Sequence, residues 1–190
     1  MSASECARFE QKLAFFAAPS LLGIKCASLL SLRKAEFQLS EHIEIFNTRA
    51  RIKGLRLKVL CECKNRYLVL IYQEAALRRQ LAKPTVQAIL QRYGYATGMT
   101  LESLLERLSG RIRQCAQFPH EIGLFLDYPT EDVQGFIENQ GENYVLCGYW
   151  KVYGNAEKAK HTFASYDKCR KFLCNKLNQG YDIYQALKIS

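Results

Sequence analysis

Residues 118–155 read FPHEIGLFLDYPTEDVQGFIENQGENYVLCGYWKVYGN, and the predicted fold depends on this stretch. The apolar run at residues 121–127 predicts a strand, and apolar residues at helical spacing after Thr130 predict a short helix. A second strand is predicted over residues 144–153, and Asn155 is a suitable N-cap for the long helix that follows. The connection between the two strands is long enough for a crossover between parallel neighbours, so the stretch predicts a βαβ-type unit.

A β-hairpin is predicted earlier in the chain. Residues 56–62 and 66–72 are rich in apolar side chains and are separated by a short segment that contains Lys64 and Asn65. Asparagine tolerates the positive φ angles of a two-residue turn, which favours antiparallel pairing of the two strands. The second strand is apolar on both faces, so we expect it to lie in the middle of a sheet.

Helical spacing of apolar residues predicts three further helices. The first covers residues 5–16 and is stopped by Pro19, the second has Pro84 in its first turn, and the third is capped by Thr100. Residues 21–32 form a short apolar segment whose secondary structure the pattern leaves open.

These elements predict an α+β (mixed α/β) fold, in which the antiparallel hairpin and the βαβ-type unit form one mixed sheet packed with several helices. The chain has 190 residues, which fits a single globular domain over residues 1–190. The predicted parts are an N-terminal helical part, a hairpin, a helical middle and a βαβα unit, at residues 1–48, 55–72, 73–117 and 118–178.

The charge of the chain bears on its partners. A formal net charge of +9 attracts anions. The densest basic run, at residues 49–58, alternates with apolar residues, as the solvated face of a strand does. The GYWKVYGN segment mixes aromatic and charged residues, as single-stranded nucleic-acid binders do, but it matches no RNA-recognition pattern. Nucleic-acid binding is therefore possible but not favoured, and the partners stay unknown.

The cysteines and the N-terminal segment bear on localisation. The eight cysteines have irregular spacings without a CxxC pair, which favours a reducing, cytoplasmic compartment. Residues 13–24 form an apolar run as long as the core of a signal peptide, but no net positive charge precedes it and Lys25 follows it. The run is also too short to span a bilayer. We therefore expect a cytoplasmic protein that does not enter the membrane.

The segments FPHEIGLFLDYPTEDVQGFIENQG and CGYWKVYGN resemble the core of an uncharacterised family of clostridial-type anaerobic bacteria, a domain of unknown function. The resemblance extends to AAPSLLGIKCASL at residues 17–29, LVLIY at 68–72 and YDKCRK at 166–171. It implies a single-domain, cytoplasmic bacterial protein and brings no activity, cofactor or catalytic residue. The family has proline more often where Cys26 stands, which argues against Cys26 as a required ligand.

One candidate chemistry is acid–base or nucleophilic. His120 stands beside Glu121, and a histidine next to a carboxylate is typical of acid–base or metal chemistry. On a strand these side chains point to opposite faces, so they converge only at a strand end or a bulge. Because His120 is in register with the apolar residues of its run, we expect a structural histidine that faces the core. Cys147 is the candidate nucleophile of a cysteine-dependent enzyme, with His120 as its base.

A second candidate is a polar ligand site on the predicted second strand. Tyr149, Lys151 and Tyr153 share one face with a cysteine, and this face combines a cation with phenols. If the two predicted strands are neighbours, Asp127 or Glu121 lies near Lys151. A cross-strand ion pair beneath a helix is the structural alternative.

Metal and phosphate sites have less support in the sequence. Cys61 and Cys63 share a strand face, but their spacing is not that of a zinc site, so they are metal candidates only if the fold supplies further ligands. Glu131 and Asp132 occupy the first turn of the helix after Thr130 and would repel a phosphate there. No metal site is expected, and the cofactors stay unknown.

These observations favour a small-ligand-binding or accessory protein, and they favour a non-catalytic role. Three alternatives stay open: a cysteine-dependent enzyme that uses Cys147 and His120, a single-stranded nucleic-acid binder, and a metal- or redox-linked accessory protein.

Overall fold

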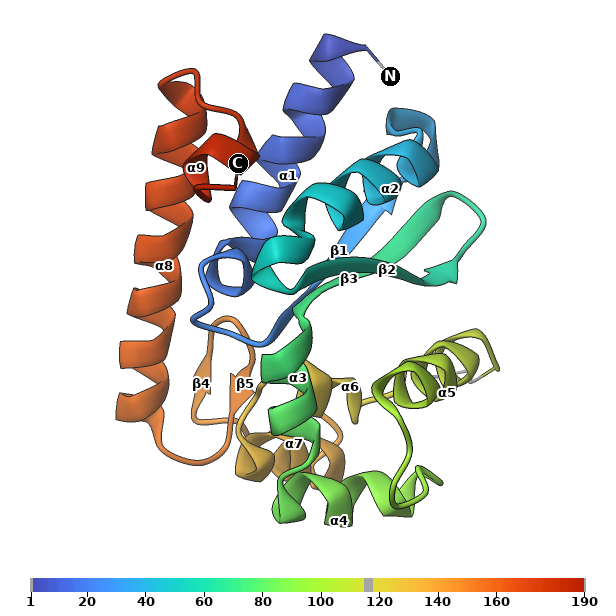
Figure 1. Ribbon diagram of the computed structural model, residues 1–190. Coiled ribbons are helices and arrows are strands. Elements are labelled where there is room, and N and C mark those ends of the chain that lie inside the picture. Colours follow the sequence, from blue (N-terminus) through green and yellow to red (C-terminus); the bar gives the residue numbers. More distant parts are fainter. Residues whose placement is uncertain (1, 115–117, 190) are drawn as a thin grey trace. The chain divides into compact units, whose positions relative to one another are not determined.

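A computed structural model describes residues 2–114 and 118–189 (Figure 1). The chain divides into two compact units: unit 1 comprises Met1–Leu77 and Tyr166–Ser190, and unit 2 comprises Arg78–Ser165. Helices and antiparallel strands are both present, which confirms the α+β class. The single domain stays a prediction. Residues 115–117, at the end of the predicted helical middle, lie outside the described residues.

Unit 1 contains an antiparallel sheet with the order β1-β3-β2, where β1 is Ala27–Arg33, β2 is Leu55–Glu62 and β3 is Arg66–Gln73. The predicted hairpin is therefore confirmed, and so is the central position of its second strand. The register of β2 shifts between Val59 and Cys61, which identifies a β-bulge at Leu60.

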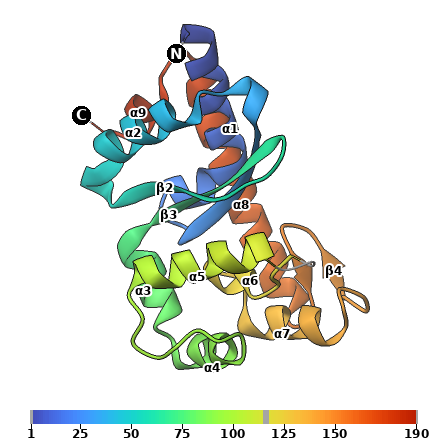
Figure 2. The same cartoon turned by 90° about the vertical axis from the view of Figure 1, so that its right-hand side faces the viewer.

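Helices cover the sheet of unit 1 (Figures 1 and 2). The helix α1 (Ala3–Leu21) contacts β1 and β3, and α2 (Leu39–Arg49) contacts β2. The short helices η1, η2 and α9 span Lys34–Glu36, Ala50–Lys53 and Ile183–Ala186, and α8 spans Ala156–Asn178 with its C-terminal part in this unit. One core cluster joins these elements and includes Phe9, Leu13, Leu30, Phe46, Val69, Ile71, Leu173 and Ile183.

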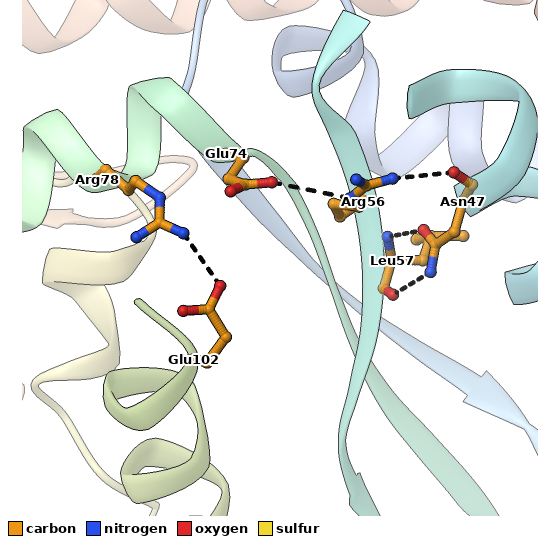
Figure 3. A network of polar contacts seen from close by, with 6 residues as sticks. All are labelled: Asn47, Arg56, Leu57, Glu74, Arg78 and Glu102. Atoms are coloured by element: carbon orange, nitrogen blue, oxygen red, sulfur yellow. Dashed lines mark hydrogen bonds and ion pairs between the residues drawn. The ribbon is translucent and has the colours of Figure 1, made fainter. Parts of the chain in front are cut away.

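A side-chain amide fastens α2 to the edge of this sheet (Figure 3). Asn47 accepts a hydrogen bond from the backbone N–H of Leu57 at 2.7 Å and donates to the carbonyl of Leu57 at 3.0 Å. Arg56 donates to the carbonyl of Asn47 at 3.0 Å and lies 3.8 Å from Glu74, the first residue of α3 (Glu74–Leu81). An edge strand presents unpaired backbone groups, and Asn47 satisfies two of them.

Two details of the N-terminal prediction are wrong. Pro19 does not stop α1, which continues to Leu21. The proline removes only one N–H donor near the helix end, and burial of the last turn offsets this loss, since Ser20 is fully buried and its hydroxyl lies 2.8 Å from that of Ser28. The helical spacing from Phe9 and Leu13 predicts Phe16 on the same inner stripe, but Phe16 is 50% exposed, and Ala17 is buried instead.

The segment at residues 21–32, which the sequence left open, contributes most of β1. Leu30 and Leu32 are buried, while Ser31 and Arg33 are exposed. This alternation has the period of a strand with one buried face, and it is visible in the sequence once the apolar segment is read residue by residue.

Unit 2 consists mainly of short helices. They are α4 (Pro84–Arg92), α5 (Leu101–Gln114), α6 (Ile122–Phe125) and α7 (Thr130–Glu138), with the last residues of α3 and the first part of α8. The two predicted helices beginning near Pro84 and Thr100 are confirmed, and the Thr100 hydroxyl accepts from the Ser103 N–H at 3.2 Å. Arg78 joins α3 to α5 through a 3.0 Å contact with Glu102 (Figure 3).

The predicted βαβ-type unit and single mixed sheet are wrong. Residues 121–127 form α6 and a turn, and residues 144–153 form a hairpin of β4 (Leu146–Cys147) and β5 (Lys151–Val152). Among the described residues every strand pair is antiparallel, in two separate sheets. A short apolar run does not distinguish a strand from a buried helical turn by periodicity. The chain reverses at Gly148, where a Cβ would overlap the ring of Phe163.

The contact between α6 and α7 is tight enough to be tested by a single methyl group. A Cβ on Gly123 would lie 2.8 Å from Cγ2 of Val133 and 3.1 Å from Cδ2 of Tyr128. We predict that Gly123→Ala lowers the free energy of unfolding by about 1–3 kcal/mol because this contact has no room for the methyl group.

The matched control is Gly110→Ala in α5, where a Cβ meets no described heavy atom within 4 Å. Alanine is the better helix former, so this variant should be more stable by about 0.5–1 kcal/mol. Urea unfolding followed by circular dichroism measures the free energy of unfolding of both variants. Equal effects of the two substitutions would contradict the packing of α6 against α7.

Candidate ligand-binding site

Unit 2 contains a cavity of about 330 Å³. Its wall combines the segment before α6, the inner side of α7 and the β4–β5 hairpin. The polar and aromatic residues that line it are His120, Tyr128, Asp132, Cys147, Trp150 and Lys151. Phe118, Ile122, Val133 and Phe136 complete an apolar surface. An apolar cavity of this size with a few convergent polar groups is typical of a small-molecule site.

The carboxylate of Asp132 organises one wall of the cavity. Asp132 is 3% exposed and accepts hydrogen bonds from Nε1 of Trp150 at 2.7 Å and from the backbone N–H groups of Tyr153 and Gly154, both at 2.8 Å. Both carboxylate oxygens are used, so α7 is fastened to the hairpin by charge-assisted bonds. Sequence reasoning missed this role, because it considered Asp132 only as a charge in the first turn of the helix that would repel a phosphate.

Aromatic rings form the wall next to Asp132. The rings of Tyr128 and Trp150 are stacked at 5.0 Å, and Phe163 meets Trp150 edge-on at 4.6 Å. The Tyr128 hydroxyl donates to the carbonyl of Tyr149 at 3.2 Å, and burial raises the pKa of Tyr128 to about 12. These contacts hold the indole ring in one orientation beside the cavity.

The hairpin places a cation and a thiol next to each other. Cys147 and Lys151 are direct cross-strand partners, and both line the cavity. The Lys151 ammonium donates to the carbonyl of Gly141 at 2.7 Å and lies 4.7 Å from the ring centre of Tyr144. Gly141 takes one of its three N–H donors. The sequence predicted a shared face for Cys147 and Lys151, and the structure provides it across a turn rather than along one strand.

His120 also lines the cavity, but it is not the core-facing histidine that the sequence predicted. It is exposed, and its ring lies 4.9 Å from that of Phe136. The register argument failed because residues 121–127 are not a strand. Among the described residues no hydrogen bond joins His120 to Cys147, so their pairing as base and nucleophile stays a prediction.

Glu121 points to a different environment from His120. Its side chain is fully buried, forms an ion pair with Arg111 and accepts a hydrogen bond from the Tyr95 hydroxyl at 3.2 Å. Burial, followed by the charge of Glu121, raises the pKa of Tyr95. The second carboxylate oxygen of Glu121, Oε2, accepts no hydrogen bond from the described residues. Glu121 therefore links the start of α6 to Arg111 of α5.

Three other predicted site residues are absent from the described lining of the cavity. Asp127 adopts a positive φ of 61° in the turn after α6. Tyr149 contacts Phe163 at 5.6 Å between ring centres. Tyr153 packs on Gly135, and burial of its hydroxyl, with lesser effects of Glu142 and Tyr144, raises the pKa of Tyr153. Of the predicted ligand face, Cys147 and Lys151 reach the cavity, and the two tyrosines do not.

The two candidate metal ligands, Cys61 and Cys63, belong to unit 1, whereas the cavity belongs to unit 2. The Sγ atoms of Cys61 and Cys63 are 3.3 Å apart. The described residues contain no group of three or more histidine, cysteine or acidic side chains placed to hold a metal ion. Among the helices of residues 2–114 and 118–189, none has both the length and the apolar character to cross a bilayer.

Comparison with known proteins places the chain in a family. A family model described as "Protein of unknown function (DUF3793)" matches residues 13–187. The chain belongs to the DUF3793 family. This match confirms the resemblance to a domain of unknown function that the sequence indicated. No curated protein and no solved structure matches the chain.

The role of Asp132 in this DUF3793 protein is testable by an isosteric change. In Asp132→Asn the amide NH₂ group faces an N–H donor, which leaves a buried donor without an acceptor. We predict a loss of about 2–3 kcal/mol in the free energy of unfolding. Glu131→Gln is the control, because Glu131 is exposed in the same helical turn and its loss should cost less than about 1 kcal/mol. Similar losses in both variants, measured by urea unfolding, would refute the role of Asp132.

The buried phenol of Tyr128 predicts a dependence of stability on alkaline pH. Its pKa rises from 10.0 to about 12 on folding, so its contribution is complete below pH 10 and is lost as the pH rises toward 12. The wild type should lose roughly 2 kcal/mol more than Tyr128→Phe across this window. Unfolding midpoints in urea at a series of pH values measure the difference. Parallel profiles for the two proteins would show that Tyr128 ionises normally.

Proposed function

We propose that this DUF3793 protein binds a small aromatic or planar apolar molecule that carries one carboxylate or similar anionic group. The observation that carries the proposal is the cavity of unit 2, where aromatic side chains and Lys151 line the same space of about 330 Å³. We also propose a cytoplasmic location, which the irregular spacing of the eight cysteines, without a CxxC pair, supports.

The shape of the cavity supports a ring-sized ligand. The stacked Tyr128 and Trp150 rings and the Phe136 ring offer flat apolar surfaces. Offset stacking of a ligand ring on such a surface contributes about 0.5–1.5 kcal/mol beyond the burial of apolar area. Because Asp132 fixes the indole before any ligand arrives, binding requires little ordering of this wall.

Charge at the cavity supports an anionic group on the ligand. Lys151 keeps two N–H donors beyond the one that Gly141 accepts, and the exposed His120 is a further donor at the wall. Asp132 is the acidic residue in the lining, and its oxygens already accept three hydrogen bonds. A carboxylate near Lys151 therefore meets donors, while a cationic ligand does not meet an available carboxylate.

A cysteine-dependent enzyme is the second candidate, since Cys147, His120 and Lys151 line the same cavity. In that case the Cys147 thiol would contact the reacting group of the substrate. The ligand-binding proposal needs no thiol, so the two candidates differ in what the removal of Cys147 does to binding.

The test uses the fluorescence of Trp150, which is the only tryptophan of the chain. Titration with 2-naphthoate, and with the neutral 2-naphthylmethanol as its charge control, should quench this fluorescence saturably. Lys151→Met should weaken 2-naphthoate by about tenfold or more and change the neutral probe little, because it removes a charge-assisted hydrogen bond. Lys151→Arg should restore most of the affinity.

The control variant is Lys158→Met, which removes an exposed lysine of α8 from outside the cavity lining. It should bind 2-naphthoate as the wild type does. Circular dichroism of each variant confirms folding. An equal loss for both probes in Lys151→Met, or no binding of either probe by the wild type, would contradict the proposal. A loss of 2-naphthoate binding in Cys147→Ser would favour the enzyme instead.

A further inference from the structure

The hairpin of unit 1 holds two thiols in direct contact. The Sγ atoms of Cys61 and Cys63 lie 3.3 Å apart, which is closer than two sulfur atoms in ordinary van der Waals contact. From this geometry we infer that Cys61 and Cys63 form a redox-active dithiol that exchanges with low-molecular-weight disulfides. The site is in unit 1 and does not rest on the ligand proposed for unit 2.

The bulge at Leu60 sets the position of the pair. Before the bulge, Val59 faces the core cluster, and regular alternation would direct Cys61 to the same side. Leu60 is the extra residue of the bulge and is only 1% exposed. Beyond it Cys61 pairs with Leu68, so Cys61 lies on the face of the sheet opposite to Val59. Cys63 is two residues further and shares this face. Its N–H donates to the carbonyl of Arg66 at 2.9 Å, which holds the backbone beside the turn.

The two thiols differ in access, which assigns them different roles. Cys63 is exposed at the end of the hairpin, while Cys61 is 7% exposed. An incoming disulfide therefore meets Cys63 first, and Cys61 is placed to attack Cys63 afterwards. Lys64 in the turn and Arg66 directly after it are exposed and favour a reagent that carries carboxylates, as glutathione disulfide does.

The exchange consists of two balanced steps. The Cys63 thiolate attacks one sulfur of the disulfide, forms a mixed disulfide and releases the first thiolate of the reagent. The Cys61 thiolate then attacks Sγ of Cys63, forms the Cys61–Cys63 disulfide and releases the second thiolate. The protein loses two electrons and two protons, and the reagent becomes two thiols. The second step is fast because Cys61 is already held next to its target.

The chain offers a direct mass readout of this reaction. Trypsin cleaves after Lys58 and Lys64, so both thiols fall in the single peptide that spans residues 59–64. The full-length protein is incubated with glutathione disulfide, remaining thiols are alkylated under denaturing conditions, and the digest is analysed by mass spectrometry. We expect this peptide to lose two hydrogens and to carry no glutathione.

Cys61→Ser is the matched variant, since it leaves Cys63 without a resolving thiol. The mixed disulfide at Cys63 should then rise by about tenfold or more over the wild type. Cys174 lies alone in the tryptic peptide at residues 172–176 and serves as the internal control, with a mixed disulfide as its only product. A wild-type peptide that stays reduced, or that accumulates glutathione at Cys63 to the same level as the variant, would overturn the inference.

Discussion

The buried carboxylate of Asp132 connects α7 to the β4–β5 hairpin, which are two of the three parts of unit 2 that make the candidate site. It accepts hydrogen bonds from the indole of Trp150 and from two successive backbone N–H groups at the end of the β4–β5 hairpin. A hairpin with only two ladder pairs has little stability of its own, so this attachment to α7 fixes its place. The attachment also sets the positions of Cys147 and Lys151, because they pair across the hairpin. The attachment of the hairpin to α7 therefore holds these two lining residues in place at the cavity.

The parts of the fold that the sequence predicted correctly depend on neighbours in the chain. The hairpin of β2 and β3 follows from two apolar runs around a short polar segment, although Asn65 does not adopt the positive φ expected of it. The helices that begin at Pro84 and Leu101 follow from apolar spacing and capping. The failures depend on distant contacts. Residues 121–127 fold as a helical turn whose buried Glu121 pairs with Arg111 and Tyr95, residues 10 and 26 positions away. No local pattern contains those partners.

The candidate site was predicted in part. Sequence reasoning selected Cys147, Lys151 and His120, and the structure brings all three to one cavity, although no βαβ-type unit exists to do so. It placed Tyr149 and Tyr153 there as well, because a single strand would have put them on the same face. It also missed Asp132, which is four residues from Phe136 and therefore lies on the inner stripe of α7. The position of this carboxylate on an apolar stripe was the sequence signal that could have predicted its buried role.

The proposed function requires that the cavity beside Trp150 receives an anionic aromatic ligand. The most direct measurement is the NMR resonance of the indole Nε1–H, which is unique because the chain has one tryptophan. Titration of the ¹⁵N-labelled protein with 2-naphthoate should shift this resonance saturably, together with the amides of Val133 and Cys147, which line the same cavity. A resonance that stays in place while amides elsewhere in the chain shift would contradict the account.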